Sequence, residues 1–163
     1  ASRSRCGCTR CAGRAGRKEA AVEVREALAG APIFSRMKRG DLNALARIAK
    51  VHRFAPGELV VREGEEAVGF YVLCRGEADV VKGAERDREQ VMGHLTEGDF
   101  FGEMALLDGF PRSASVRAVS ECECLVLVRW DFLALVRANP EVASAILPVL
   151  SRRLRECEDR LLP

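Results

Sequence analysis

Apolar and polar residues follow a strand-like pattern through the middle of the chain. Short runs rich in β-branched and aromatic residues occupy residues 59–61, 70–73, 78–81, 91–95, 115–119 and 124–128, and glycine-containing dipeptides separate them. Short strands at this spacing, with glycine turns between them, are typical of an antiparallel sandwich or barrel. The charged stretch 82–89 fits the exposed tip of a hairpin.

Helical patterns precede this β-rich part. A short helix is expected within residues 19–28, because Gly30 and Pro32 end the pattern. A second helix is expected to begin near Asp41, a residue type that caps helix N-termini well. Its apolar face is formed by Leu42, Leu45, Ile48 and Ala49. Both helices are predicted to be amphipathic.

Helical patterns also follow the strands. Asp131 can cap a helix that carries Phe132 and Leu135 on its apolar side. The pair Asn139-Pro140 then combines an N-cap residue with a proline at the first helical position, which opens a final helix toward Leu162. Because Pro148 lies inside that last pattern, it should bend the helix.

One segment, residues 100–111, interrupts the strand pattern with consecutive apolar residues bracketed by glycines. A helix beginning at Gly102 would point free backbone N–H groups outward, where an anion is favoured. Arg112 follows nine residues after Glu103, so its guanidinium can fold back and pair with a phosphate, and Ser113 adds a hydroxyl. A carboxylate such as that of Glu103 suits a sugar hydroxyl. These residue types predict a site for a nucleotide with one compact phosphate; an ion pair between Glu103 and Arg112, tying a loop to the barrel, is the structural alternative.

The residues of this segment match a known family. Residues 101–107, Phe-Gly-Glu-Met-Ala-Leu-Leu, and 111–116, Pro-Arg-Ser-Ala-Ser-Val, resemble the phosphate-binding cassette of cyclic nucleotide-binding domains. That cassette is shared by the catabolite activator protein, protein kinase A regulatory subunits and cyclic-nucleotide-gated channels. The resemblance covers about residues 30–157. It implies a mainly β fold with flanking helices: an eight-stranded antiparallel, jelly-roll-like β-roll with N-terminal helices, an inserted phosphate-binding helix, and C-terminal hinge and lid helices.

The resemblance also implies roles for individual residues. Glu103 would accept the ribose 2′-hydroxyl, while Arg112 would neutralise the cyclic phosphate with help from Ser113. The remaining residues expected to line the ligand cradle are Gly102, Met104, Ala105 and Ala114. Ligand contacts made by both the roll and the last helix would move the C-terminal helices.

Contacts to the base are harder to assign. The resemblance implies that the purine packs against apolar residues of the roll and is covered by the last helix. Val91, Leu95 and Val116 are therefore candidate walls, and Arg153, with Arg152 and Arg155 as alternatives, is the candidate lid that stacks on the base. The ligand is expected to be cAMP rather than cGMP, although Ser113 fits either.

Charge divides the chain unevenly. The 163 residues include 26 Lys and Arg and 24 Asp and Glu, yet residues 1–18 hold six of the basic residues and no acidic one. We therefore expect a basic flexible tail over 1–18, N-terminal helices over 19–50, the β-roll over 51–130 and hinge and lid helices over 131–163. The tail could contact phosphate groups of nucleic acid or lipid, or be a solvated extension.

Seven cysteines and no secretory segment indicate a reducing compartment, so a cytoplasmic location is expected, with the cytosolic part of a membrane protein as an option. The spacing of Cys6, Cys8 and Cys11 resembles the N-terminal ligands of iron–sulfur regulators. This leaves a redox or metal sensor on the same fold as an alternative, alongside a docking module without ligand. In the favoured interpretation no metal is expected.

Catalytic motifs are missing from the pattern, and two histidines leave little material for acid–base chemistry, so we do not expect an enzyme. The first residue is alanine, which suggests a processed chain or a fragment. The effector would be a channel, transporter, kinase or DNA-binding module outside this chain, and direct sequence-specific DNA binding is not expected. A homodimer could form through a stripe on the last helix: Ile146, Val149, Leu150, Leu154 and Leu161.

Overall fold

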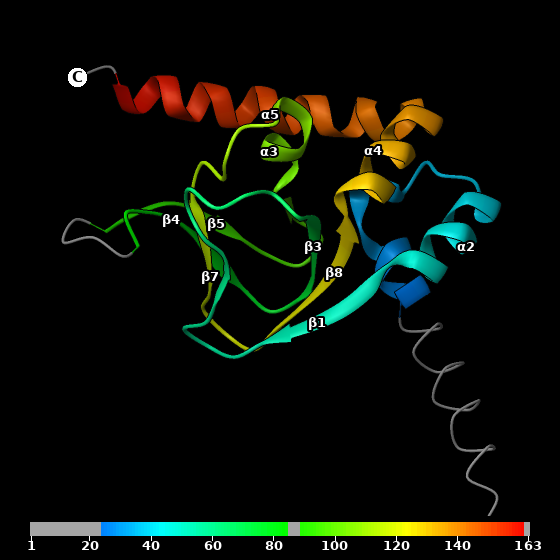
Figure 1. Ribbon diagram of the computed structural model, residues 1–163, viewed down its shortest axis with the longest axis horizontal. Helices are drawn as coiled ribbons and strands as arrows, with labels where there is room; N and C mark the ends of the chain where they lie inside the picture. The colour runs from blue at the N-terminus through cyan, green and yellow to red at the C-terminus, as the bar shows by residue number, and fades with distance from the viewer. Residues whose placement is uncertain (1–23, 85–88, 162–163) are drawn as a thin grey trace, which may run out of the picture.

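Eight strands form two antiparallel sheets in a computed structural model that describes residues 24–84 and 89–161 (Figure 1). The first sheet has the order β1 (Lys50–Phe54), β8 (Cys122–Val128), β3 (Gly69–Arg75), β6 (Phe100–Phe101). The second has the order β2 (Leu59–Val61), β7 (Ser115–Ala118), β4 (Ala78–Lys82), β5 (Gln90–Leu95). The prediction of an eight-stranded antiparallel roll is confirmed.

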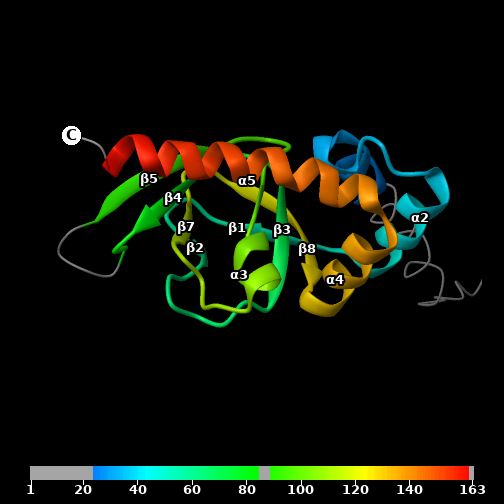
Figure 2. The ribbon, with the colours of Figure 1, turned by 90° about the horizontal axis from the view of Figure 1, so that it is seen from above.

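Helices precede and follow the roll along the chain. Residues 24–30 are helical and lead into η1 (Pro32–Phe34) and α2 (Arg39–Ile48). A short helix, α3 (Glu103–Asp108), separates β6 from β7. The last strand is followed by α4 (Arg129–Ala138) and α5 (Pro140–Leu161), whose axes differ by 107°. As Figure 2 shows, α5 crosses the roll from the N-terminal helices toward the β4–β5 hairpin, with α3 to one side of it.

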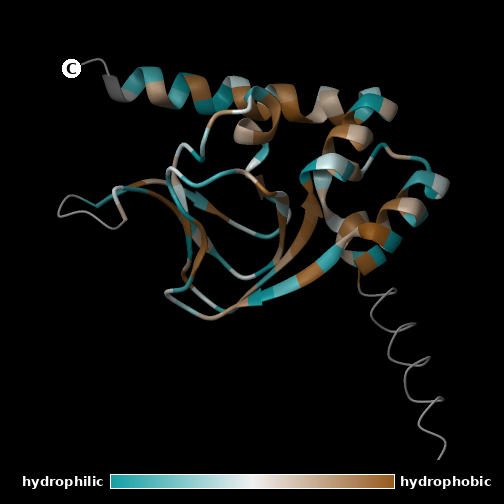
Figure 3. Cartoon of the chain, viewed as in Figure 1, coloured by the Kyte–Doolittle hydropathy of each residue, from teal (hydrophilic) through white to brown (hydrophobic). Residues whose placement is uncertain are grey.

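Two hydrophobic clusters hold these layers together. The larger one joins the first sheet to the helices, and Phe34, Phe70 and Phe132 are fully buried in it. The rings of Phe70 and Phe132 stack with their centroids 4.5 Å apart, which ties β3 to α4. The smaller cluster fills the space between the two sheets around Leu73 and Cys124. Figure 3 shows the hydrophobic colour along β8, which contributes to both clusters, as β3 and β6 also do.

The start of α2 differs from the prediction. The helix begins at Arg39, with Lys38 in extended conformation at the N-cap, and Asp41 lies within the first turn without a capping side-chain hydrogen bond. A carboxylate in the first turn still favours the positive end of the helix dipole. Leu45 is buried as expected, whereas Ile48 is 45% exposed, because the helix packs on the core with its Leu42 and Leu45 side.

The C-terminal helices also begin differently from the prediction. Helix α4 starts at Arg129, immediately after β8, so Asp131 lies in its first turn and is not its cap. Pro140 is the first residue of α5, as expected. The Asn139 side chain donates a hydrogen bond to the Leu135 carbonyl, 3.2 Å away, and so closes α4. Helix α5 continues through Pro148 as one helix (Figures 1 and 2).

Candidate ligand-binding site

The segment from β6 to β7 is built around Gly102. This residue has φ +84° and lies at the N-cap of α3. A Cβ atom at this position would collide with Nη1 of Arg112 and lie 3.2 Å from the Gly69 carbonyl oxygen. Glycine is therefore required both by the left-handed backbone and by the close approach of Arg112.

Glu103, the first residue of α3, is fully buried. Its Oε1 atom accepts a hydrogen bond from Nη1 of Arg153, which comes from α5 fifty residues later. Its Oε2 atom is buried and has no hydrogen-bond partner among the described residues. Because a buried carboxylate oxygen without a partner is costly, this atom marks a place where a ligand donor would be stabilised.

Arg112, 5% exposed, contacts the residue before Glu103. Its Nη1 donates to the Gly102 carbonyl at 2.7 Å, and its Nη2 donates to the Gly69 carbonyl at 2.6 Å. The guanidinium also lies 5.7 Å from the ring centroid of Tyr71. Burial lowers the pKa of Arg112 from its ordinary value, but an arginine remains charged at neutral pH. The arrangement keeps a buried cation beside the start of α3, with no ion pair to Glu103.

The backbone of Arg112 is held by the turn after β2. Its N–H donates to the Glu65 carbonyl at 2.9 Å, and its carbonyl accepts from the Gly64 N–H at 2.8 Å. In the same turn, the N–H of Glu63 donates to the Ser115 hydroxyl at 2.9 Å. Two separate segments of the chain therefore fix where the Arg112 side chain starts.

Arg153 contacts the cassette rather than an open space above it. Besides the bond to Glu103, its Nη2 donates to the Phe100 carbonyl at 2.6 Å, and its guanidinium lies 5.5 Å from the Phe100 ring centroid. We expected this arginine to stack on a base; the structure instead uses it to connect α5 to the start of α3. The reason is electrostatic, since the buried carboxylate attracts the guanidinium more strongly than a neutral surface would.

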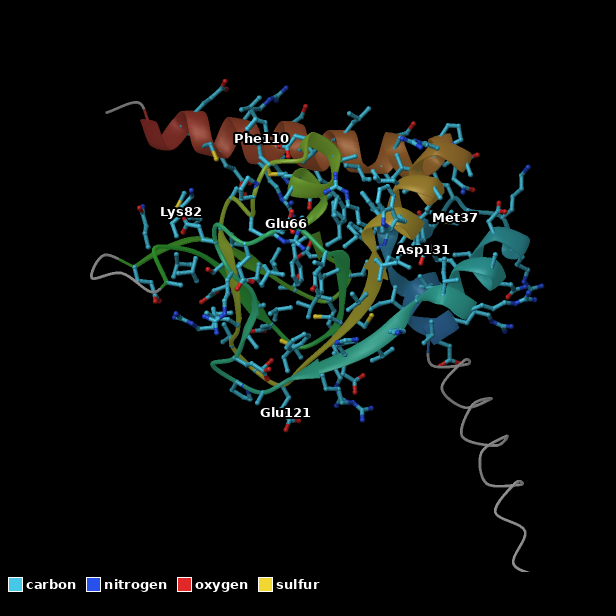
Figure 4. All side chains as sticks on the ribbon, in the orientation of Figure 1. Met37, Glu66, Lys82, Phe110, Glu121 and Asp131 are labelled. Atoms are coloured by element: carbon cyan, nitrogen blue, oxygen red, sulfur yellow. The ribbon has the colours of Figure 1, made fainter. Side chains whose placement is uncertain are left out.

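The other predicted site residues are distributed unevenly. Met104 and Ser113 are exposed, Ala114 is half-buried, and Ala105 belongs to the core between sheet and helices. Val91 is 54% exposed on β5. Leu95 and Val116, expected as walls of a base pocket, are instead buried in the cluster between the two sheets. Figure 4 shows the cassette between the roll and α5, with Phe110 marking the end of the segment that begins with α3.

Three contributions to this site were not predicted. The Gly69 and Phe100 carbonyls each accept an arginine hydrogen bond, and Tyr71 lies beside the Arg112 guanidinium. The carbonyls could not have been found, because every residue has one and only the fold brings these two to the site. Tyr71 could have been suspected as an aromatic residue in a buried strand.

The cysteines do not form a metal site in the described part of the chain. Cys122 and Cys124 are buried and Cys74 is half-buried, and burial raises the pKa of the Cys124 thiol to about 12. Within residues 24–84 and 89–161, no group of three or more His, Cys, Asp or Glu side chains could hold a metal ion. Cys6, Cys8 and Cys11 lie outside the described residues.

Membrane spans were also sought in the described part of the chain. No single helix there is long and apolar enough to cross a bilayer, and α4 with α5 would reach the required length only as a sharply bent pair.

Comparisons with known proteins agree with this geometry. Residues 51–139 match the family model described as "Cyclic nucleotide-binding domain". The chain is 32% identical over 129 residues to the cyclic AMP receptor protein of Thermus thermophilus, covering 79% of this chain and 60% of that protein. It is 37% identical over 105 residues to a cAMP-dependent protein kinase regulatory subunit of Hypocrea atroviridis, covering 64% and 22%.

A solved structure is also similar to this chain. The regulatory domain of Toxoplasma gondii PKA, co-crystallised with cAMP, superimposes with a TM-score of 0.62 at 30% identity, covering 74% of this chain and 44% of that one. The chain spans between about a fifth and three fifths of the length of the two sequence relatives. Both relatives are named for receptor or regulatory roles. The match over residues 51–139, together with the β-roll and its cassette, shows that the chain belongs to the cyclic nucleotide-binding domain family.

Proposed function

We propose that this domain binds a cyclic nucleotide in the cassette around α3 and uses that binding to control the position of α5. The observation that carries the proposal is the buried, unpartnered Oε2 atom of Glu103 at the start of α3, where the buried Arg112 guanidinium bonds the carbonyl of the preceding residue, Gly102. One acceptor and one cation held this way suit a ligand that presents a hydroxyl and a single negative charge.

The cassette residues fit the two ends of such a ligand. Glu103 would accept a hydrogen bond from the ribose 2′-hydroxyl, which relieves the cost of its unpaired oxygen. Arg112 would neutralise the cyclic phosphate, and the exposed Ser113 hydroxyl would add a hydrogen bond. We infer that Gly102, Met104, Ala105 and Ala114 form the cradle, with Val91 at the exposed β5 side.

We infer that cAMP is preferred to cGMP. The two sequence relatives are named for cyclic AMP, and the Toxoplasma structure contains cAMP. The exposed Ser113 hydroxyl is compatible with adenine and with guanine. The preference for cAMP therefore rests on the sequence identity to these proteins.

Coupling to α5 would run through one carboxylate. Oε1 of Glu103 is bonded to Arg153, while Oε2 remains available, so Glu103 can hold α5 and a ligand hydroxyl at the same time. Binding would then favour the arrangement in which α5 lies over the cassette, to the extent that the ligand prefers that arrangement.

The effector and the location of the whole protein belong to the same proposal. The domain would be a non-catalytic cytoplasmic sensor that acts on a channel, transporter, kinase or DNA-binding module outside this chain. On α5, Ile146 is used in the core, whereas Leu147 and Leu154 are 63% and 61% exposed. These exposed leucines are available for pairing with a second copy.

Calorimetric titration with cAMP and cGMP tests the proposal. Saturable binding of cAMP, with weaker binding of cGMP, is expected for the unaltered chain. Arg112→Ala should weaken cAMP binding by at least a hundredfold, because a phosphate would lose its buried partner, at a cost of several kcal/mol. Arg137→Ala, which removes an exposed arginine of α4, serves as the control.

Loss of binding must be separated from loss of folding. Arg112 also bonds the Gly69 and Gly102 carbonyls, so thermal unfolding of each variant is measured, and Arg112→Lys keeps the charge without the two-pronged geometry. Unchanged cAMP affinity in a folded Arg112→Ala variant, or no binding of either nucleotide to the unaltered chain, would refute the proposed function.

A further inference from the structure

A second charged surface lies away from the cassette, on the N-terminal helices and β1. Residues 24–54 contain seven Lys and Arg but two Asp and Glu, a formal charge of +5. We call this surface the cationic face; its exposed basic residues are Arg25, Arg36, Lys38, Arg39, Arg47 and Arg53, whereas Lys50, three positions before Arg53 on β1, points to the other side of that strand. Figure 4 shows nitrogen-tipped side chains projecting outward around α2, on the side opposite the β4–β5 hairpin.

Most of these cations are not neutralised within the molecule. Arg53 pairs with Glu123 at 2.7 Å, whereas the other five form no ion pair with a described carboxylate. The charge is also concentrated here, because residues 55–163 hold 13 Lys and Arg against 20 Asp and Glu. A surface of unpaired cations on an otherwise acidic molecule attracts and orients an anionic partner.

The cationic face also contains apolar side chains and a hollow. Ile48, at the end of α2, is 45% exposed, and Val51 on β1 is 37% exposed. A hollow of about 400 Å³ lies beside these cations. It is lined by Arg25, Glu26, Ala29, Arg39, Leu42 and Asn43. Cations that alternate with apolar side chains match the boundary between lipid headgroups and acyl chains.

The alternatives fit this surface less well. A DNA duplex is bound by an element that enters a groove, whereas the cations here are spread over residues 24–30, α2 and β1. A second copy of the chain would have to offer its acidic part, but several of its carboxylates already pair internally, among them Glu89 with Arg117 and Glu123 with Arg53. Neither partner explains the exposed Ile48 and Val51.

We propose that the cationic face binds the surface of an anionic phospholipid bilayer, independently of the nucleotide site. Each lysine or arginine near such a surface contributes roughly a fivefold increase in partitioning. The face would bring the domain to the membrane with the cassette at a distance from the lipid, since the cassette lies between the roll and α5. The basic residues of 1–18 carry the same sign of charge in the sequence.

Vesicle co-sedimentation of the full chain tests this inference. Binding is expected to vesicles of phosphatidylcholine with about a third phosphatidylserine, to be weak with phosphatidylcholine alone, and to fall as salt rises. The variant Lys38→Gln with Arg47→Gln should partition roughly 30-fold less. The matched control is Arg129→Gln with Arg137→Gln, two arginines of α4, which should bind like the unaltered chain.

Three outcomes would overturn the inference: no binding to the anionic vesicles, equal behaviour of the two double variants, or tighter binding to a 20-base-pair duplex that Lys38→Gln with Arg47→Gln abolishes. The last result would assign the face to nucleic acid. Cyclic-nucleotide titration of the same variants should give unaltered affinity, so failure of this inference is distinguishable from failure of the nucleotide site.

Discussion

At the scale of single residues, Glu103 combines two roles that conflict energetically. Its carboxylate is fully buried and half satisfied, with Oε1 on Arg153 and Oε2 unpaired. A side chain selected only for stability would not leave that oxygen without a donor. The residue is better explained by binding than by folding, and the two effects can be separated by an isosteric change.

Glu103→Gln should weaken cAMP binding by tenfold or more, because a charged acceptor is replaced by a neutral one. The free energy of unfolding should change by less than about 1 kcal/mol, since removal of a buried charge offsets the weaker bond to Arg153. Calorimetry gives the affinity and urea unfolding gives the stability. Full retention of affinity would show that Oε2 does not face the ligand.

At the scale of elements, Glu63 links two turns that meet near the cassette. Its Oε2 accepts the Gly83 N–H at 2.8 Å, and its Oε1 lies 3.5 Å from Nζ of Lys82 (labelled in Figure 4). Gly64 and Glu65, the next two residues, bond the backbone of Arg112. The β4–β5 hairpin and Arg112 are thus positioned by the same turn.

Glu63→Ala should therefore lower cAMP affinity severalfold, because the turn that holds the Arg112 backbone would be less well fixed. Glu63 itself need not contact the ligand. Glu63→Gln keeps an acceptor for Gly83 and loses the partly exposed pair with Lys82, which contributes little. It should restore most of the affinity. Titration of both variants checks this; if Glu63→Gln is as impaired as Glu63→Ala, charge rather than the hydrogen bond matters.

The β4–β5 pair carries a pH-dependent contact. A hydrogen bond to Asp79, 2.7 Å from Nδ1, raises the pKa of His94, and the Glu77 carboxylate lies 3.5 Å from Nε2. Arg117 lies opposite Asp79 on β7 and bonds the Glu89 carboxylate. Because the folded state holds the proton more tightly, the stabilisation is complete at pH below about 6.5 and is lost as pH rises through the raised pKa.

The melting temperature should consequently fall slightly between pH 6 and 8, and His94→Gln should flatten that part of the profile. The effect is small because the side chains are exposed to solvent. Thermal unfolding at several pH values measures it. An identical slope in both proteins would locate the pH dependence elsewhere.

The same elements show what a sequence can reveal. The six apolar runs became strands because alternation and glycine turns are local signals. The prediction missed β1, whose residues are almost all exposed, and β6, whose two buried phenylalanines are too few to show an alternating pattern. Leu95 was placed at the ligand and lies between the sheets, because alternation does not show which face of a strand a ligand occupies.

At the scale of the whole molecule, the cassette could be predicted from contiguous residues, whereas its connection to α5 could not. The bond between Glu103 and Arg153 joins residues fifty positions apart, and the sequence predicts Arg153 as a lid over the base, with no contact to Glu103. The fold brings the two together because α5 passes beside α3 (Figure 2). That contact is where ligand binding and helix position would meet.

If Arg153 transmits binding to α5, cAMP should slow hydrogen exchange of the amides in the second half of α5 in the unaltered chain. In Arg153→Ala the slowing should disappear there and persist around α3, since Glu103 and Arg112 still hold the ligand. At a ligand concentration of about 100 times Kd, binding stabilises the folded chain by about 2.7 kcal/mol in either protein. When the unaltered chain and Arg153→Ala are compared at equal saturation, a difference in α5 exchange therefore cannot come from a difference in ligand-induced global stability. Equal protection of α5 in both proteins would mean that the helix is held by its apolar contacts with the core, and that Arg153 carries no signal.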